Sequence, residues 1–168
     1  DIDELINLIS KAKKPVVYTG GGVINSGPEA SESLREFIRL IGFPITSTLQ
    51  GLGAFPGDDN QFIGMLGMHG TYEANNAMHD CDLLINIGAR FDDRITGKID
   101  EFSPKLKKVH IDIDPSSINK NVKVDLAIVG DVKTVLSSTM KSLKQKKSKF
   151  LKSNKQNTSK WWEKIQKW

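Results

Sequence analysis

Short apolar runs alternate along the chain with segments in which apolar residues recur at helical spacing. The apolar runs predict five strands, at 15–20, 44–48, 83–88, 108–113 and 126–130. The helical spacing predicts helices over 1–13, over 28–41 ahead of Gly42, after Thr71, and over 132–143 behind the capping residue Asp131. Segment 49–62 is expected to be loop. The alternation predicts an α/β fold, a Rossmann-like, doubly wound parallel sheet of five to six strands with helices on both faces.

Glycine-rich and charged stretches follow the predicted strands. Three glycines come after the first strand, and the third strand leads into the segment GARFDDR at 88–94. The last two strands end near Asp112 and Asp131. The carboxyl ends of parallel strands share one edge of a sheet, and ligands of doubly wound sheets bind at that edge. We therefore expect these stretches to form one site.

The residue types at this edge suit a phosphate-containing ligand, and each has a purely structural alternative. The glycine run lets main-chain N–H groups approach a pyrophosphate, but it lacks the pattern G-x-G-x-x-G and equally fits a tight turn. Arginine binds phosphate or carboxylate, and aspartate binds ribose hydroxyls. The structural alternative is that these residues form exposed ion pairs, which contribute little to stability. Asp131 is equally suited to cap the helix that follows it.

The segment LGMHGT at 66–71 indicates contact with a flat ligand rather than with a metal ion. Gly67 and Gly70 flank Met68 and His69, and methionine packs well on aromatic rings. No second histidine or cysteine stands near at the spacing of metal ligands, so we predict no metal site. The chain also has neither a G-x-S-x-G elbow nor a G-x-x-x-x-G-K-[ST] loop. These patterns indicate cofactor binding without a catalytic group.

Length and charge narrow the class of protein further. The 168 residues suit one domain, with no apolar stretch long enough to span a membrane and no signal peptide. A single cysteine fits a reducing compartment, and the missing initial methionine leads us to expect a piece of a longer protein. Residues 141–168 hold ten lysines and one glutamate, a net +9, so in a chain of net +4 the first 140 residues carry −5. This division argues against a nucleic-acid-binding core.

The helical apolar pattern fades after about residue 143. Segment 146–168 is rich in lysine and lacks a long apolar face. We predict a basic linker here, solvated or a frayed helix, whose Trp161, Trp162 and Trp168 pack on a partner domain.

Several segments together resemble the central domain of the acetolactate synthase (acetohydroxyacid synthase) large subunit, a thiamine-diphosphate enzyme. They are PVVYTGGGV, TSTLQGLGAFPGDD, GMLGMHGTYEANNAMHDCDLLINIGARFDDRITGK, VHIDIDPSSINKN and VGDV. The resemblance implies a central FAD-binding domain over 1–145, and a linker over 146–168 toward a C-terminal domain. It also implies that FAD lies across the carboxyl edge of the sheet and undergoes no net redox change.

The resemblance further implies a set of site residues. FAD would be held by Gly20, Gly21, Gly22, Thr48, Leu49, Leu66, Gly67, Met68, His69, Gly88, Ala89, Arg90, Phe91, Asp92, Asp112, Ile113, Asp131 and Val132. Leu66 to His69 would lie along the flavin, Gly88 to Asp92 along the ribityl and phosphate groups, and the last four at the adenosine end. Asp93 and Arg94 would face the substrate channel.

The implied enzyme condenses two 2-ketoacids, pyruvate with pyruvate or 2-ketobutyrate, on thiamine diphosphate in branched-chain amino acid biosynthesis. Its catalytic glutamate belongs to an N-terminal domain, and its thiamine diphosphate and Mg²⁺ motif to a C-terminal domain. This chain has neither, so we expect no catalytic residue in it and no activity of it alone. The implied partners are those two domains, further copies of the subunit and a regulatory subunit, in the cytoplasm or a plastid, without nucleic acid or membrane.

Three other interpretations stay open at this point. The chain could be the central domain of another thiamine-diphosphate enzyme, of the pyruvate oxidase or glyoxylate carboligase type. It could be a stand-alone dinucleotide-binding module, or a domain that only holds two catalytic domains together. The segment GARFDDRITG favours acetolactate synthase among these.

Overall fold

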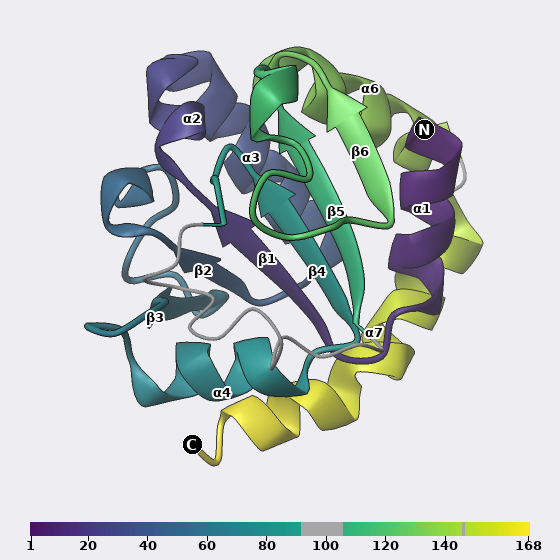
Figure 1. The fold of residues 1–168 in the computed structure, drawn as a ribbon. Helices are drawn as coiled ribbons and strands as arrows, with labels where there is room; N and C mark the ends of the chain where they lie inside the picture. Colours follow the sequence, from purple (N-terminus) through teal and green to yellow (C-terminus); the bar gives the residue numbers. More distant parts are fainter. Residues whose placement is uncertain (92–105, 146) are drawn as a thin grey trace.

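The computed structural model describes residues 1–91, 106–145 and 147–168, and its centre is one six-stranded sheet (Figure 1). The strands are β1 (Pro15–Thr19), β2 (Ile45–Ser47), β3 (Phe62–Met65), β4 (Leu83–Ile87), β5 (Lys107–Asp112) and β6 (Leu126–Val129). The helices are α1 (Ile2–Lys11), α2 (Gly21–Asn25), α3 (Pro28–Ile41), α4 (Tyr72–Asp80), α6 (Val132–Gln145) and α7 (Lys147–Ile165), with short 3₁₀ turns η1 (Leu49–Gly51) and η3 (Pro115–Ser117).

Every strand pair in the sheet is parallel. The strand order is β3-β2-β1-β4-β5-β6, so the chain builds outward from β1 on one side and then returns to continue from β4 on the other. In the central rows, Val17 on β1 pairs with Ile85 on β4, which pairs with Val109 on β5. The predicted α/β, doubly wound parallel sheet is confirmed, and the five predicted strands match β1, β2, β4, β5 and β6 within about a residue at each end.

The residues that the sequence predicted to begin or end helices do so in the structure. Pro28 occupies the first turn of α3, and Gly42 ends this helix in the left-handed conformation with φ of 73°. Thr71 caps α4 by accepting a hydrogen bond from Ala74 N. None of the described helices combines the length and the apolar composition that a membrane span requires.

The strand β3 falls partly in the segment that was expected to be loop, and the rest of it was not predicted. It is a four-residue edge strand in which only Ile63 is buried, and its Gly64 has φ of 96°. The register with β2 shifts between Ile45 and Ser47. A short edge strand with one buried side chain and a left-handed glycine has no apolar alternation to detect.

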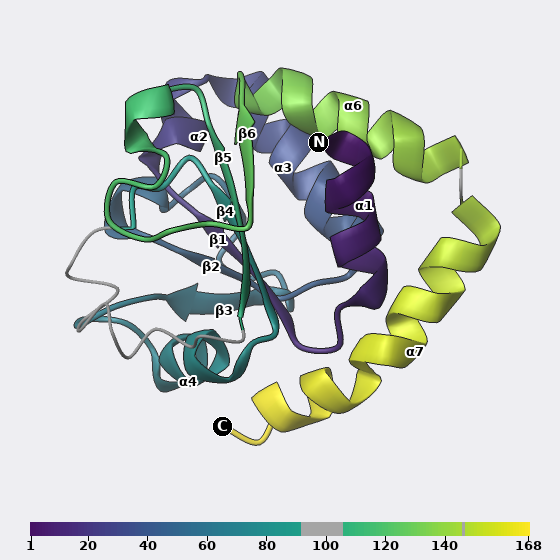
Figure 2. The ribbon, with the colours of Figure 1, turned by 45° about the vertical axis from the view of Figure 1, so that its right-hand side comes forward.

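Helices cover both faces of the sheet, as predicted (Figure 2). On one face, α1, α3 and α6 pack against β-branched and leucine side chains in the larger core cluster, with Leu5, Phe37 and Leu136 fully buried. On the other face, α4 and the end of α7 form a second cluster with Tyr18, Leu84 and Phe91. The strand runs are apolar on both sides because each face is covered.

The segment that was predicted to be a linker or frayed helix contains α7, which packs on this same domain. Trp161 is 2% exposed, and its indole N–H donates to Pro15 O at 2.9 Å. Trp162 donates to Gly42 O at 3.0 Å, and α7 contacts α1, α3 and α6. The expectation that these tryptophans pack on a partner domain is wrong for Trp161. In both ribbon views α7 passes along the amino-terminal edge of the sheet (Figures 1 and 2).

The sequence pattern missed this packing because, within residues 153–165 of α7, two of the four buried positions are polar. Asn154, Thr158, Trp161 and Ile165 recur at helical spacing, and all are buried. Asn154 donates to Ile41 O, and Thr158 bonds back to its own helix at Asn154 O. The Asn154 amide N–H and the Thr158 hydroxyl thus donate to main-chain carbonyls, which offsets part of the cost of burying these polar side chains, while Asn154 Oδ1 has no hydrogen-bond partner among the described residues.

Candidate functional site

The carboxyl edge of the sheet brings together the loops that the sequence singled out. Their described residues follow the ends of all six strands: Gly20, Gly21 and Gly22 after β1; Thr48 and Leu49 after β2; Leu66, Gly67, Met68 and His69 after β3; Gly88, Ala89, Arg90 and Phe91 after β4; Asp112 and Ile113 at the end of β5; Asp131 and Val132 after β6. The strand order reverses between β1 and β4, and parallel sheets bind ligands at such a reversal. Asp92, Asp93 and Arg94 lie outside the described residues.

The two loops at the reversal point interlock through their glycines. Gly22 N donates to Gly88 O at 2.9 Å, and Gly20 N donates to Ile87 O at 3.0 Å. A Cβ on Gly20 would come within 2.4 Å of Gly88 O, and one on Gly22 within 2.8 Å of Gly88 Cα. Close contact between two main chains therefore requires both glycines, which gives the run a packing role whether or not a ligand binds.

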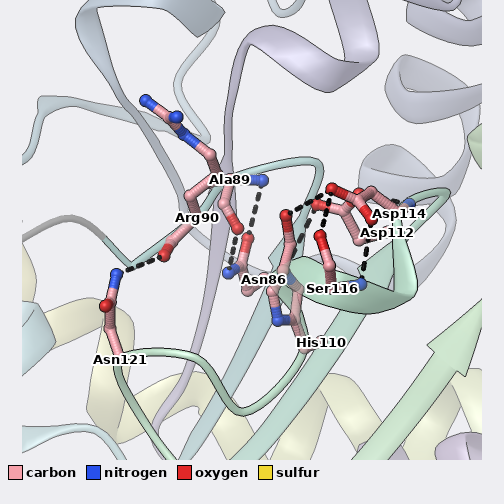
Figure 3. Close-up of polar contacts among 9 residues, drawn as sticks. Asn86, Ala89, Arg90, His110, Asp112, Asp114, Ser116 and Asn121 are labelled. Atoms are coloured by element: carbon pink, nitrogen blue, oxygen red, sulfur yellow. Dashed lines mark hydrogen bonds and ion pairs between the residues drawn. The ribbon is translucent and has the colours of Figure 1, made fainter.

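The loop after β4 is held by two asparagines from different parts of the chain (Figure 3). Asn86 is fully buried in β4, donates to Ala89 O at 2.7 Å and accepts from Ala89 N at 3.1 Å. Asn121 donates to Phe91 O at 3.0 Å and to Arg90 O at 3.3 Å. Asn86 and Asn121 thus hold the main chain of residues 89–91, which includes Arg90, the first residue of the arginine and aspartate cluster.

The end of β5 carries two aspartates whose carboxylates hold the local main chain. Asp112 accepts from Asp114 N at 2.9 Å, and Asp114 accepts from Ser116 N and the Ser116 hydroxyl (Figure 3). The Ser116 hydrogen bonds hold the pKa of Asp114 below its usual value, because they stabilise the carboxylate. This turn keeps two anionic groups at the edge of the sheet.

His110 lies beneath the loop after β4, on the face of the sheet that α4 and the end of α7 cover. It is fully buried, and its ring makes an edge contact with Phe91 at 5.4 Å between centroids. Its Nε2 lies 3.5 Å from Asp112 Oδ2, and neither ring nitrogen makes a hydrogen bond within the described part of the chain. Burial lowers the pKa of His110, and the Asp112 carboxylate opposes that effect.

Several of the predicted residues have a structural role that the geometry shows directly. Asp131 Oδ1 accepts from Thr134 N at 3.0 Å, so it caps α6. Thr48 Oγ1 accepts from Gly51 N at 3.0 Å and caps η1. The side chains of Leu66, Ala89, Phe91 and Val132 are buried in the core. A ligand at the edge would meet these four residues through their main chain.

The exposed apolar side chains of the domain also gather at this edge. Met68 is 79% exposed, Leu49 66% and Ile113 65%. The large apolar side chains that the described residues expose all lie at or shortly after a strand end: Ile24, Leu49, Leu52, Met68, Tyr72, Ile113 and Val129. Exposed apolar groups that cluster at one edge, and not across the surface, mark an interaction site.

Residues 2–139 match the family model described as "Thiamine pyrophosphate enzyme, central domain". This chain belongs to that family. The central domain is 46% identical over 167 residues to the acetolactate synthase large subunit of Haemophilus influenzae, covering 99% of this chain and 28% of that protein. It is 52% identical over 143 residues to the acetolactate synthase of Mycobacterium avium, covering 85% of this chain and 23% of that protein.

A third relative of the central domain is the acetolactate synthase isozyme 3 large subunit of Escherichia coli. The identity is 42% over 167 residues, which cover 99% of this chain and 28% of that protein. The central domain thus spans 23% to 28% of the length of these three relatives.

Three polar residues of this central domain contribute to the site without having been predicted. Asn86, His110 and Asn121 hold or contact the loop after β4. For Asn86 the signal is a polar residue inside the otherwise apolar strand LLINI. Asn121 carries no such signal, because it reaches Phe91 across 30 positions of sequence. Within the described residues, no three histidine, cysteine, aspartate or glutamate side chains gather as metal ligands would.

Proposed function

We propose that this chain is the central domain of an acetolactate synthase large subunit. In that enzyme, two 2-ketoacids, pyruvate with pyruvate or 2-ketobutyrate, are condensed on thiamine diphosphate. The observation that carries the proposal is 46% identity to one such subunit across 99% of this chain. Thiamine diphosphate and Mg²⁺ would be held by the N- and C-terminal domains of the same subunit. Further copies of the subunit and a regulatory subunit complete the proposed assembly, in the cytoplasm or a plastid.

The carboxyl edge fits FAD in three respects. Exposed Met68 and Leu49 offer apolar contact to a flat isoalloxazine ring. The side chain of Arg90 suits the pyrophosphate group, because a guanidinium donates to anionic oxygens, and Gly88 beside it would lie along the ribityl chain. Asp112, at the end of β5, suits ribose hydroxyls.

The remaining proposed FAD contacts extend this arrangement. Gly20, Gly21, Gly22 and Thr48 would line the cofactor beside the interlocked loops, with Leu66, Gly67 and His69 along the flavin. Ile113, Asp131 and Val132 would lie at the adenosine end, and Ala89, Phe91 and Asp92 along the phosphates. When bound, the flavin would undergo no net oxidation or reduction. This chain's residues would bind and orient it, and Asp93 and Arg94 would face the substrate channel.

Flavin binding tests the proposal directly. The full-length subunit is expected to purify with the absorbance of oxidised flavin, and the stripped protein to recover it on titration with FAD. FMN and NAD serve as competing ligands of related chemistry. Equal affinity for NAD and FAD would favour a general dinucleotide-binding module. A full-length protein that neither binds flavin nor forms acetolactate would refute the proposal.

The role of Arg94 is tested by kinetics in the same full-length enzyme. Arg94→Ala is expected to leave flavin content unchanged and to lower kcat/KM for ketoacids by roughly 10- to 150-fold, the loss of one charge-assisted contact of about 1.5–3 kcal/mol. Arg90→Ala is the matched control, because its proposed effect falls on flavin affinity. An unchanged kcat/KM together with a lower Tm would make Arg94 a structural residue.

The 168-residue chain alone is expected to form no acetolactate from pyruvate with thiamine diphosphate and Mg²⁺, because the groups for thiamine chemistry lie in other domains. The same assay on the full-length subunit is the positive control. Turnover by the chain alone would contradict the assignment of catalysis to those domains.

A further inference from the structure

The loop after β4 has an unusual main-chain conformation. Gly88 has φ of 65°, and three residues later Phe91 has φ of 49°. Positive φ is easy for glycine but strained for an aromatic residue, which adopts it only where the surroundings impose it. The contacts around Phe91 therefore indicate what holds the loop.

Phe91 is held through both its ring and its carbonyl. The ring is buried between Tyr18 on β1, at 6.2 Å between centroids, and His110 on β5, at 5.4 Å. Its carbonyl accepts from Asn121 at 3.0 Å. These contacts fix the position of Phe91, and the two hydrogen bonds between Asn86 and Ala89 fix the main chain two residues earlier.

Asn86 has no packing reason to be an asparagine. Its neighbours in β4 are leucine and isoleucine, and it is fully buried in the row between Tyr18 and His110. A buried amide is unfavourable unless hydrogen bonds compensate for its lost water. In Asn86 both the amide N–H and the amide oxygen are used on one residue, Ala89, which closes the loop over the end of the strand.

We infer that Asn86 is a positioning residue: by pairing with Ala89 it holds the loop over 88–91 in the conformation that contacts the cofactor. The inference rests on the proposed function, in which this loop lies along the ribityl and pyrophosphate groups of FAD. Asn86 itself touches no cofactor in this proposal, since its side chain is buried beneath the loop. It acts through the main chain of Ala89.

Asn86→Asp in the full-length subunit isolates this role. The carboxylate keeps an acceptor for Ala89 N, but it repels Ala89 O in place of donating to it. Burial raises the pKa of a carboxyl, and the protonated acid regains the donor. FAD affinity of the variant is therefore expected to be weak at about pH 8 and restored at about pH 5. The neighbouring titratable groups, Tyr18 and His110, are present in the wild type too, whose own pH profile supplies their contribution.

Asn154→Asp is the matched control. Asn154 is also a buried asparagine that donates to a main-chain carbonyl, Ile41 O, but it lies on α7 at the opposite edge of the sheet. The two readouts are the Kd for FAD and the hydrogen-exchange protection factor of the amides over 88–91. The second readout needs no cofactor. At about pH 8, Asn86→Asp is expected to raise the Kd for FAD and to lower the protection factors, each by about tenfold, which corresponds to about 1.4 kcal/mol. Asn154→Asp is expected to change neither readout.

The outcomes separate the inference from the proposed function. The inference would be overturned if Asn86→Asp at about pH 8 had the same Kd for FAD and the same protection factors as the wild type. It would also be overturned if Asn154→Asp lost as much FAD affinity and protection as Asn86→Asp. A wild type that binds no FAD would refute the cofactor proposal, while the protection factors would still decide whether Asn86 orders the loop. If Asn86→Asp fails to fold, Asn121→Ala replaces it, because Asn121 is exposed and holds the same loop from outside. An unchanged FAD affinity in that variant would then count against the inference.

Discussion

Truncation of Trp161 measures how firmly α7 belongs to the central domain. The ring is 2% exposed, stacks edge-on against Trp168 at 5.9 Å and donates to Pro15 O at 2.9 Å. Trp161→Ala removes a fully packed ring, which costs about 3–5 kcal/mol. Trp161→Phe keeps an aromatic ring but leaves the carbonyl of Pro15 without this donor, at about 1–3 kcal/mol. For a domain of this size, about 3–5 kcal/mol lowers Tm by roughly 6–20 °C.

Urea and thermal unfolding of the 168-residue chain, followed by far-ultraviolet circular dichroism, provide the measurement. Lys160→Ala, at an exposed position of the same helix, is the control and is expected to change the free energy of unfolding by less than about 0.5 kcal/mol. The expected order of loss is Trp161→Ala, then Trp161→Phe, then Lys160→Ala. If Trp161→Ala behaves like the lysine variant, α7 contributes nothing to the fold and the linker interpretation stands.

Three further predictions concern the interlocked loops and two buried groups. Gly22→Ala is expected to destabilise the domain by about 1–3 kcal/mol, because its Cβ would overlap the backbone of the opposite loop, whereas Gly57→Ala meets no atom within 4 Å and is expected to be neutral in the same melts. Burial, opposed by Asp112, lowers the pKa of His110 in the folded state. The stability that neutral His110 contributes is therefore full above about pH 6.5 and is lost as the pH falls below that value. His110→Gln is expected to flatten the dependence of the free energy of unfolding on pH in this range, and an unaltered pH dependence would contradict this. Burial raises the pKa of the Cys81 thiol, so a disulfide reagent at about pH 8 is expected to react with it only after unfolding, and rapid reaction of the native protein would count against that burial.

The sequence predicted those parts of the fold whose side chains repeat with the period of their element. The run LLINI predicts β4, and Leu34, Phe37, Ile38 and Ile41 predict the buried face of α3, because the burial of each element follows its apolar pattern. The edge strand β3 buries only Ile63, and α7 buries Asn154 and Thr158 beside Trp161. β3 therefore has no apolar alternation, and α7 continues the apolar spacing of Trp161 and Ile165 toward its start only through the polar residues Asn154 and Thr158.

The position of the candidate site was predictable for a topological reason. Parallel strands place all their carboxyl ends at one edge, so the loops after β1, β4 and β5 had to meet there. What the sequence did not reveal is which side chains hold those loops. Asn121 and Phe91 are 30 positions apart, and nothing in either local sequence specifies that they pair.

The packing of α7 along the amino-terminal edge of the sheet also has a consequence during protein synthesis. The carbonyl of Pro15 and the indole of Trp161 that donates to it are 146 positions apart. At about 5–20 residues per second, the ribosome adds that much chain in roughly 7–30 s. All six strands precede Trp161 in the chain, so the contact between Trp161 and the carbonyl of Pro15 cannot form until the whole sheet has been synthesised. Until the ribosome has added Trp161, the amino-terminal edge of the sheet lacks the cover that α7 gives it in the finished domain.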